Sequence, residues 1–283
     1  MHPYMNKIAA LSTMHGKEQA IAEPFNEVLH VSITVSKNLN TDLLGTFSGE
    51  VEREDTPIET LRKKARLGMK ELGLSLGMAS EGSFGPHPQL PLIAADHEML
   101  VWIDDDLGIE IVEQEISIDT NFSATKVHSW QELTPFIEKV KFPSHALIVR
   151  SNSYFDRNHI FKGLTTEEEI KEAIKKCTSA SEDGLAHIET DMRAHMNPTR
   201  MKVINGLAKK LASRLFQLCP KCSCPGWGKV DVVVGLPCEL CGLKTKQISH
   251  IVYGCPRCEM KEVKMREDGV LRASSTYCDW CNP

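Results

Sequence analysis

Long apolar runs and strong net charge are both missing from this sequence. No stretch reaches the roughly 18 to 20 apolar residues of a transmembrane helix, and the formal net charge is only -5. A chain of this charge has no dominant basic surface, which argues against nucleic acid or an anionic membrane as its main partner. The N-terminus has a short apolar stretch but no signal-peptide cleavage pattern. We therefore expect a cytoplasmic protein without a membrane partner.

Cysteine is nearly absent from residues 1–218 and abundant after them. Nine of the ten cysteines follow Leu218, and eight of them form four CxxC pairs. In a reducing compartment such pairs indicate metal ligands, and two pairs can hold one tetrahedral zinc ion. The predicted ligands of two structural Zn²⁺ sites are Cys219, Cys222, Cys238, Cys241, Cys255, Cys258, Cys278 and Cys281. The same distribution predicts an α/β domain over residues 1–218 and a zinc-ribbon domain over residues 219–283.

The order in which the four CxxC pairs combine is less certain from sequence. Residues 259–265, 266–269 and 270–275 have the pattern of a hairpin between the last two pairs, which favours sequential pairing. Nested pairing, with the two inner pairs on one ion and the two outer pairs on the other, stays open. Cys224 and His250 are expected to be non-ligands. A region this short has little core of its own, so we expect it to need metal to fold.

Strands and helices alternate through residues 1–218. A capping box of Thr56 and Glu59 and a terminal Gly73 predict the clearest helix, whose lysines, Lys64 among them, are expected on a solvated face. The predicted strands cover residues 7–13, 30–36, 74–79, 98–103, 109–118 and 145–150. The predicted helices cover residues 18–29, 56–73, 129–139 and 165–177, with one more from Pro198. Because one pair of strands reads as a hairpin, the fold class is α/β with a mixed, elongated sheet flanked by helices.

Three polar loops carry the residues expected to do chemistry. The first, residues 12–17, joins a strand to a helix and contains Thr13, His15 and Lys17. A hydroxyl, a glycine and a lysine at a helix N-terminus suit a phosphate, although the spacing is not that of a P-loop. The second, residues 80–88, offers Glu81 as a Mg²⁺ ligand or general base, and Ser83 and His87 as substrate contacts. The alternative is that this second loop is a turn, in which the glycines and prolines only set the backbone conformation.

The third polar loop is the segment from His187 to Met201. If it starts as a strand, alternate side chains share one face, and Pro198 suits the first turn of the helix that follows. The residues of interest are Glu189, Asp191, Arg193, His195, Asn197 and Arg200. Asp191 would hold metal with Glu81, His195 would move a proton, and the two arginines would bind phosphate. The alternative is a solvated charged loop with local ion pairs.

Two resemblances follow from these motifs. The chain resembles a bacterial family of uncharacterised proteins with the same zinc-ribbon tail. The likeness rests on the motifs STMHGKE, ASEGSFGPHP, TDMRAHMNPTRM, GLPCELCG and CDWCNP. Residues 7–218 are more distantly similar to the inosine/xanthosine triphosphate pyrophosphatase and Maf-like superfamily, through Thr13 to Lys17, Ala79 to Ser83 and Arg193 to Arg200. This chain has a single Glu81 where that superfamily has an acidic pair, and it lacks the aromatic-Asp-Pro loop. The likeness implies a similar fold and a nucleotide pyrophosphatase-like activity.

The sequence therefore predicts a Mg²⁺-dependent hydrolase that acts on a nucleotide or related phosphate. No GxSxG elbow accompanies the serines and histidines, which argues against a nucleophilic hydrolase. The alternative function is a non-catalytic adaptor that binds nucleic acid or protein through its zinc ribbons.

Overall fold

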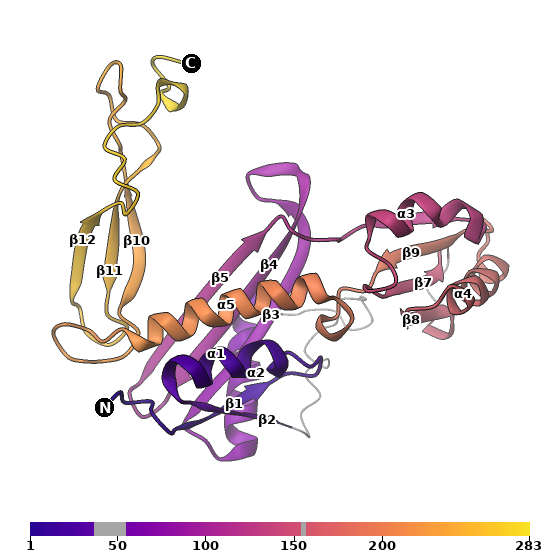
Figure 1. The fold of residues 1–283 in the computed structure, drawn as a ribbon, viewed down its shortest axis with the longest axis horizontal. Helices are drawn as coiled ribbons and strands as arrows, with labels where there is room; N and C mark the ends of the chain where they lie inside the picture. Colours follow the sequence, from indigo (N-terminus) through magenta and orange to yellow (C-terminus); the bar gives the residue numbers. More distant parts are fainter. Residues whose placement is uncertain (37–54, 154–156) are drawn as a thin grey trace.

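The computed structural model describes residues 1–36, 55–153 and 157–283. The described residues form three sheets with helices packed around two of them, and a cysteine-rich C-terminal region (Figure 1). The predicted mixed α/β class with a C-terminal cysteine-rich region is confirmed. The strands of residues 1–218 are divided between two sheets, however, and each sheet has its own hydrophobic core.

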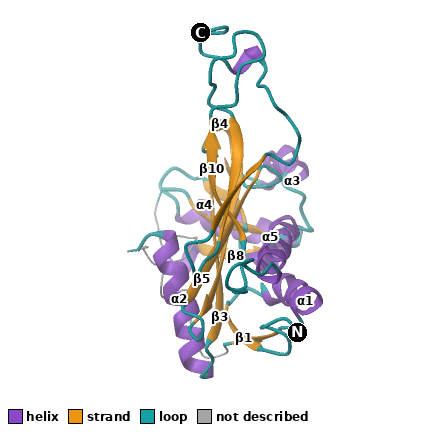
Figure 2. Cartoon of the chain, turned by 90° about the vertical axis from the view of Figure 1, so that its left-hand side faces the viewer, coloured by secondary structure: helices purple, strands orange, loops and turns teal. Residues whose placement is uncertain are grey.

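The first sheet has five strands in the order β2-β1-β3-β4-β5. β1 lies parallel to β2 and β3, whereas β3, β4 and β5 are antiparallel. Its strands are β1 (Ile8–Ser12), β2 (Ser32–Val35), β3 (Leu76–His87), β4 (Leu90–Asp104) and β5 (Ile109–Ser117). Helices α1 (Glu18–Leu29) and α5 (Pro198–Phe216) cover one face, and α2 (Pro57–Leu72) covers the other (Figure 2).

The ends of α2 follow from local chemistry. The Thr56 side chain accepts a hydrogen bond from the Glu59 backbone, and the Glu59 carboxylate accepts one from the Thr56 backbone, which completes the predicted capping box. Gly73 ends the helix in the left-handed conformation that favours glycine. Lys64 differs from the prediction of a solvated lysine. It is only 7% exposed because it faces Glu81 on the sheet.

The predicted loop over residues 80–88 is wrong for most of its length. β3 continues to His87 and pairs with β4 from Leu76 opposite Asp104 to His87 opposite Leu90. Glycine and proline suggested a loop, but β4 begins at Leu90 rather than at Glu98 and supplies a partner throughout. As a consequence, the side chains of this segment alternate between the two faces of the sheet.

The second sheet has four antiparallel strands in the order β6-β9-β7-β8. They are β6 (Ala124–Val127), β7 (Leu147–Ser151), β8 (Ile160–Leu164) and β9 (Ala186–Thr190). The helical segments η2 (Trp130–Leu133), α3 (Thr134–Lys139) and α4 (Glu167–Ala180) pack on this sheet, and η3 (Arg157–His159) precedes β8. Cys177 lies in its core, as expected for a small buried side chain. The whole unit is inserted between β5 and α5 (Figure 1).

The C-terminal region is a three-stranded antiparallel meander, β10 (Gly228–Val234), β11 (Ile248–Gly254) and β12 (Lys261–Met265), followed by the short η5 (Ser275–Tyr277). The predicted hairpin over residues 259–275 is wrong, because β12 pairs with β11 and residues 270–275 form no named strand. None of the helices in the described ranges combines the length and apolar character of a membrane span.

Candidate functional site

Lys17 connects the first two polar loops. β1 ends at Ser12 opposite Ala79, so among the described residues no strand pairs with β3 beyond Ala79 on that side. Lys17, at the start of α1, reaches this edge and donates to the Ser80 carbonyl oxygen at 3.2 Å and to its hydroxyl oxygen at 3.1 Å. Burial is the main cause that lowers the pKa of Lys17 to about 8, and the positive charge of Arg200 is the second. The lysine loop and the β3 segment therefore meet at this edge.

Arg200 brings the third polar segment to the same place. Asn197 caps α5, and its side-chain oxygen accepts a hydrogen bond from the Arg200 backbone at 3.0 Å. The Arg200 side chain is 1% exposed. Its Nε donates to Glu98 Oε1 at 2.6 Å, and its guanidinium lies 5.1 Å from the centre of the Phe84 ring. This buried ion pair joins α5 to β4.

Gly82 makes room for that pair. It lies opposite Glu98 in the β3–β4 ladder, so the two residues share a face of the sheet. A Cβ atom on Gly82 would overlap Glu98 Oε1 and the Arg200 guanidinium. The glycine is therefore needed because another group approaches the backbone closely, and not for a turn.

A second buried ion pair lies on the opposite face of the sheet. Lys64 of α2 donates to Glu81 Oε2 at 2.7 Å, and the two side chains are 9% and 4% exposed. The Lys64 carbonyl oxygen accepts a hydrogen bond from the Ser12 hydroxyl at 2.6 Å, which fixes α2 against the end of β1. We call Lys17, Lys64, Glu81, Asp96, Glu98 and Arg200 the ion cluster.

Asp96 completes the ion cluster. It is 1% exposed and lies two residues before Glu98 on β4, so both side chains point to the face of α5. Burial, followed by the charge of Glu98, raises the pKa of Asp96 to about 8. Asp96 Oδ1 and Glu98 Oε2 are buried and have no hydrogen-bond partner among the described residues. Perturbed titratable groups of this kind are typical of functional sites.

Sequence reasoning missed Lys64, Asp96 and Glu98. Lys64 looked like one of several lysines on a helix surface, and the two acids lay in or beside a segment that has the pattern of an ordinary strand. The usable signal was that Asp96 and Glu98 stand two residues apart, immediately before the apolar run of residues 99–103. Strand periodicity places such acids on one face, and that face is otherwise buried.

The other residues predicted in the first two loops lie between β1 and α1 and along β3. The His15 and His195 rings are stacked with centroids 5.2 Å apart, so the first and third segments also touch at the surface. Thr13 is 9% exposed, and its hydroxyl oxygen has no hydrogen-bond partner among the described residues. Ser83 is half-buried on β3, and His87 Nδ1 accepts a hydrogen bond from the Gln89 backbone at the hairpin tip.

Asp191 and Arg193 form a fork beside the second sheet. Both Asp191 oxygens accept hydrogen bonds from the Arg193 guanidinium, and Oδ2 also accepts one from the Gly163 backbone at 3.0 Å. Glu189 pairs with His187 at 3.2 Å. β9 ends at Thr190, so the predicted alternation over residues 189–195 does not extend along one strand.

The predicted Mg²⁺ pair of Glu81 and Asp191 does not fit this arrangement. Each carboxylate is already paired with a cation, Lys64 or Arg193. In the described ranges, the groups of three or more ligand atoms within 4.8 Å are the two cysteine groups, with no carboxylate group among them. Mg²⁺ requires several oxygen ligands with little competing positive charge.

The eight cysteines of the CxxC pairs form two groups of four. The proximal cysteine group contains Cys219, Cys222, Cys255 and Cys258, and the distal cysteine group contains Cys238, Cys241, Cys278 and Cys281. Closest sulfur–sulfur distances are 3.6 and 3.7 Å in the first and 3.6 and 3.9 Å in the second. Four thiolates at about 2.3 Å from a tetrahedral zinc ion are about 3.8 Å apart. Each group can therefore hold one structural metal ion.

Both the sequential and the nested pairing are wrong, because the groups combine the first pair with the third and the second with the fourth. The reason is the meander. One strand separates each CxxC pair from the next, and each antiparallel strand carries the chain to the other end of the sheet. Alternate pairs therefore meet at the same end. Cys224 and His250 lie outside both groups, as predicted.

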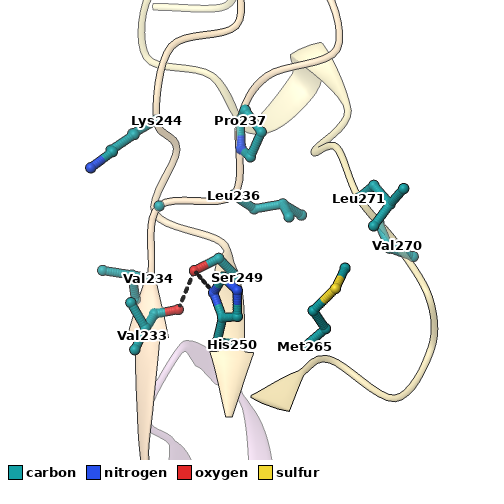
Figure 3. A pocket seen from close by; sticks show the side chains of 11 residues that line it. Val233, Val234, Leu236, Pro237, Lys244, Ser249, His250, Met265, Val270 and Leu271 are labelled. Carbon is teal, nitrogen blue, oxygen red and sulfur yellow. Dashed lines mark hydrogen bonds between the residues drawn. The ribbon is translucent and has the colours of Figure 1, made fainter. Parts of the chain in front are cut away.

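The two cysteine groups have different surroundings. Cys219, Cys224 and Trp227 belong to the main hydrophobic core with Ile111 and Leu215. The distal end instead exposes Leu240 at 73% and Trp280 at 76%. A pocket of about 310 Å³ lies between the distal cysteine group and the ends of the strands, and its lining is mainly apolar, including Leu236, Met265 and Leu271 (Figure 3).

Comparison with known proteins places these features in a family. No curated protein and no solved structure matches the chain. The model of a domain of unknown function, DUF6671, matches residues 64–283, which include most of the ion cluster and both cysteine groups. This match runs across residue 218, and the likeness to the Maf-like superfamily stays a prediction. The chain belongs to the DUF6671 family.

Proposed function

We propose that the protein is a hydrolase acting on a nucleotide or a related phosphate, with the phosphate bound at the ion cluster. The observation that carries this proposal is the convergence of Lys17, Glu81 and Arg200, from three separate segments, with Asp96 and Glu98. They gather where β1 ends, at the carboxyl edge of the parallel strands. Ligands of α/β sheets bind at such edges.

The charge balance of the ion cluster favours an anionic ligand. Because the pKa of Asp96 is raised to about 8, its carboxyl group is neutral at neutral pH. Three cations, Lys17, Lys64 and Arg200, then face two anions, Glu81 and Glu98. A phosphate would offset this surplus, and the start of α1 beside Lys17 adds the positive end of a helix dipole.

Access to the ion cluster favours entry at Lys17. Lys17 is 7% exposed, whereas Asp96, Glu98 and Arg200 are at most 1% exposed. A phosphate that enters past Gly16 would meet Lys17 first, with the stacked His15 and His195 at the surface beside it. In this proposal Lys17 binds the phosphate, and Arg200 stabilises the negative charge of the phosphate from the buried side. The carboxyl groups of the ion cluster donate and accept protons.

Phosphate release from purified full-length protein tests the proposal. A panel of nucleoside triphosphates would be assayed with Mg²⁺ and with a chelator, and nucleotide binding would be measured by calorimetry. Lys17→Met should abolish both binding and turnover, while Lys70→Met, an exposed lysine on α2, should change neither. The proposal fails if the wild-type protein hydrolyses no member of the panel.

A second candidate is a non-catalytic adaptor that binds a protein through the distal end of the zinc ribbon. Exposed Leu240, Leu271 and Trp280 favour it, since monomeric proteins rarely leave several large apolar side chains together at one end. In both candidates zinc is the metal we expect at the two cysteine groups, because tetrahedral thiolate sites select it. Absent turnover, together with partner binding that Glu81→Gln leaves unaltered, would favour the adaptor.

A further inference from the structure

Two neighbouring carboxyl groups in the ion cluster have buried oxygen atoms that no donor satisfies. Asp96 and Glu98 are 1% and 0% exposed and share one face of β4. Glu98 Oε1 accepts a hydrogen bond from Arg200. Glu98 Oε2 and Asp96 Oδ1 have no hydrogen-bond partner among the described residues. Buried acceptors without a donor are rare in folded proteins and call for a specific explanation.

We propose that Asp96 and Glu98 share one proton and act as the acid–base pair of the proposed hydrolysis. A proton held between the two carboxyl groups turns one acceptor into a donor and satisfies both oxygen atoms at once. Adjacent buried carboxyl groups behave in this way because two negative charges at close range cannot both persist. This inference rests on the proposed function for its catalytic part, but not for the shared proton.

The groups around Asp96 determine which carboxyl carries the proton. Glu98 on β4, Arg200 on α5 and Lys17 at the start of α1 are the charged groups that act on it, and Phe84 lies opposite it on β3. Arg200 binds Glu98 directly and compensates its negative charge. Asp96 is buried and has no ion-pair partner among the described residues, and its pKa is raised to about 8. Asp96 is therefore the acid, and Glu98 is the base.

The reaction can be balanced with this pair. Water attacks phosphorus, the bond from phosphorus to the leaving oxygen breaks, and that oxygen keeps the electron pair and takes the Asp96 proton. The proton released by the attacking water goes to Glu98 and is shared again with Asp96. The pair therefore begins and ends each turnover with one proton, and attack on the terminal phosphorus of a nucleoside triphosphate gives the nucleoside diphosphate and inorganic phosphate.

Infrared difference spectroscopy of the full-length protein tests the shared proton directly. Wild-type protein titrated from pH 5 to pH 10 should lose the carbonyl stretch of a protonated carboxyl group with a midpoint near 8. Asp96→Asn should abolish that signal and still fold, because its amide N–H can donate to Glu98 in place of the acid. Asp105→Asn, a half-exposed carboxylate just beyond the end of β4, should keep it. A wild-type protein without such a signal would overturn the proposal.

Kinetics of the same variants test the catalytic role with whichever nucleoside triphosphate the wild-type protein hydrolyses. Asp96→Asn should lower kcat about 100-fold or more, leave KM and nucleotide binding nearly unchanged, and remove the decline of kcat above pH 8. Wild-type kcat and an unaltered pH profile in this variant would overturn the assignment. If the signal is present but no triphosphate is hydrolysed, the proposed function and the catalytic role both fail, and only the shared proton stands.

Discussion

The two cysteine groups have the same number and type of ligands, but they lie in different parts of the molecule. The proximal cysteine group is continuous with the core beneath α1 and α5, where Cys219 packs with Leu211 and Leu215. The distal cysteine group lies beyond β10, whose seven residues span about 23 Å, and exposed side chains surround it. A ligand set therefore does not by itself determine what a metal stabilises, because the packing around it decides.

The proximal end and the ion cluster are parts of one body. Arg200 lies in the first turn of α5, and the same helix continues without a break to Phe216, close to Cys219. Arg214 of this helix binds Glu113 of β5 at 2.7 Å and donates to the Gly226 carbonyl oxygen. We therefore expect changes at either end of α5 to affect the stability of the whole body, and changes at the distal end to affect little beyond it.

The largest expected effect is loss of the metal ion that we propose at the proximal cysteine group. Cys219→Ser should remove a structural ion whose binding contributes on the order of 10 kcal/mol, comparable with the total stability of a domain. We expect loss of the main cooperative unfolding transition measured by calorimetry. Cys278→Ser should leave that transition in place and release one metal equivalent. Equal effects of the two variants would contradict the distinction between the ends.

Removal of the Glu98 charge should have the next largest effect. Glu98→Gln leaves Arg200 buried without its counter-ion, which typically destabilises a protein by about 3–5 kcal/mol. Glu110→Gln is the matched control, since Glu110 pairs with the half-exposed Arg62 and such pairs contribute about 1 kcal/mol or less. Urea unfolding measures both. Similar losses in the two variants would show that burial of the Glu98–Arg200 pair has no energetic consequence.

Gly82→Ala tests the close approach of Arg200 to β3. The added methyl group would overlap Glu98 and Arg200, and overpacking of this kind destabilises by about 1–3 kcal/mol. Gly85→Ala, three residues along the same strand, meets no atom within 4 Å and should be nearly neutral. Urea midpoints that rank the two variants in the opposite order would contradict this account of Gly82.

The pH dependence of stability has a definite sign. The pKa of Asp96 rises from 3.8 to about 8 on folding, so between these values the folded state binds one more proton than the unfolded state. The free energy of unfolding should therefore fall as pH rises through this window. Asp96→Asn should reduce that slope when unfolding is measured across the range. An identical slope in the variant would contradict a raised pKa in the folded protein.

The smallest effect is expected at the distal end. Trp280→Ala and Leu240→Ala remove side chains that are 76% and 73% exposed, and such surface changes usually alter stability by about 0.5 kcal/mol or less. Thermal unfolding would measure both variants. A large loss of stability would mean that the distal end packs against the rest of the protein.

Local patterns in the sequence were sufficient to predict where a helix begins and which cysteines are metal ligands. The capping box of Thr56 and Glu59 predicted the start of α2, and the CxxC spacing predicted all eight cysteines of the two groups. The pairing was not local, because it depends on how many strands separate one CxxC pair from the next. Reading residues 248–254 as a strand in its own right would have given the alternating arrangement.

The same distinction between local and non-local information applies to the ion cluster. Lys17, Glu81 and Arg200 lie in segments whose composition was unusual enough to be noticed, and Lys17 contacts Ser80, the residue before Glu81 on β3. Glu98 and Asp96 lie on a strand, and only the β3–β4 register brings them to Gly82 and Arg200. That register depends on strand pairing in a segment whose glycines and prolines had predicted a loop. The division of the chain at residue 218 stays a prediction, and core contacts cross it.

A crystal structure of the full-length protein with a non-hydrolysable nucleoside triphosphate would test the central claim most directly. The account predicts phosphate oxygens within hydrogen-bond distance of Lys17 Nζ, at the start of α1, with Arg200 still bound to Glu98 behind it. A nucleotide bound at the distal end of the ribbon, or at any place remote from Lys17, would contradict it.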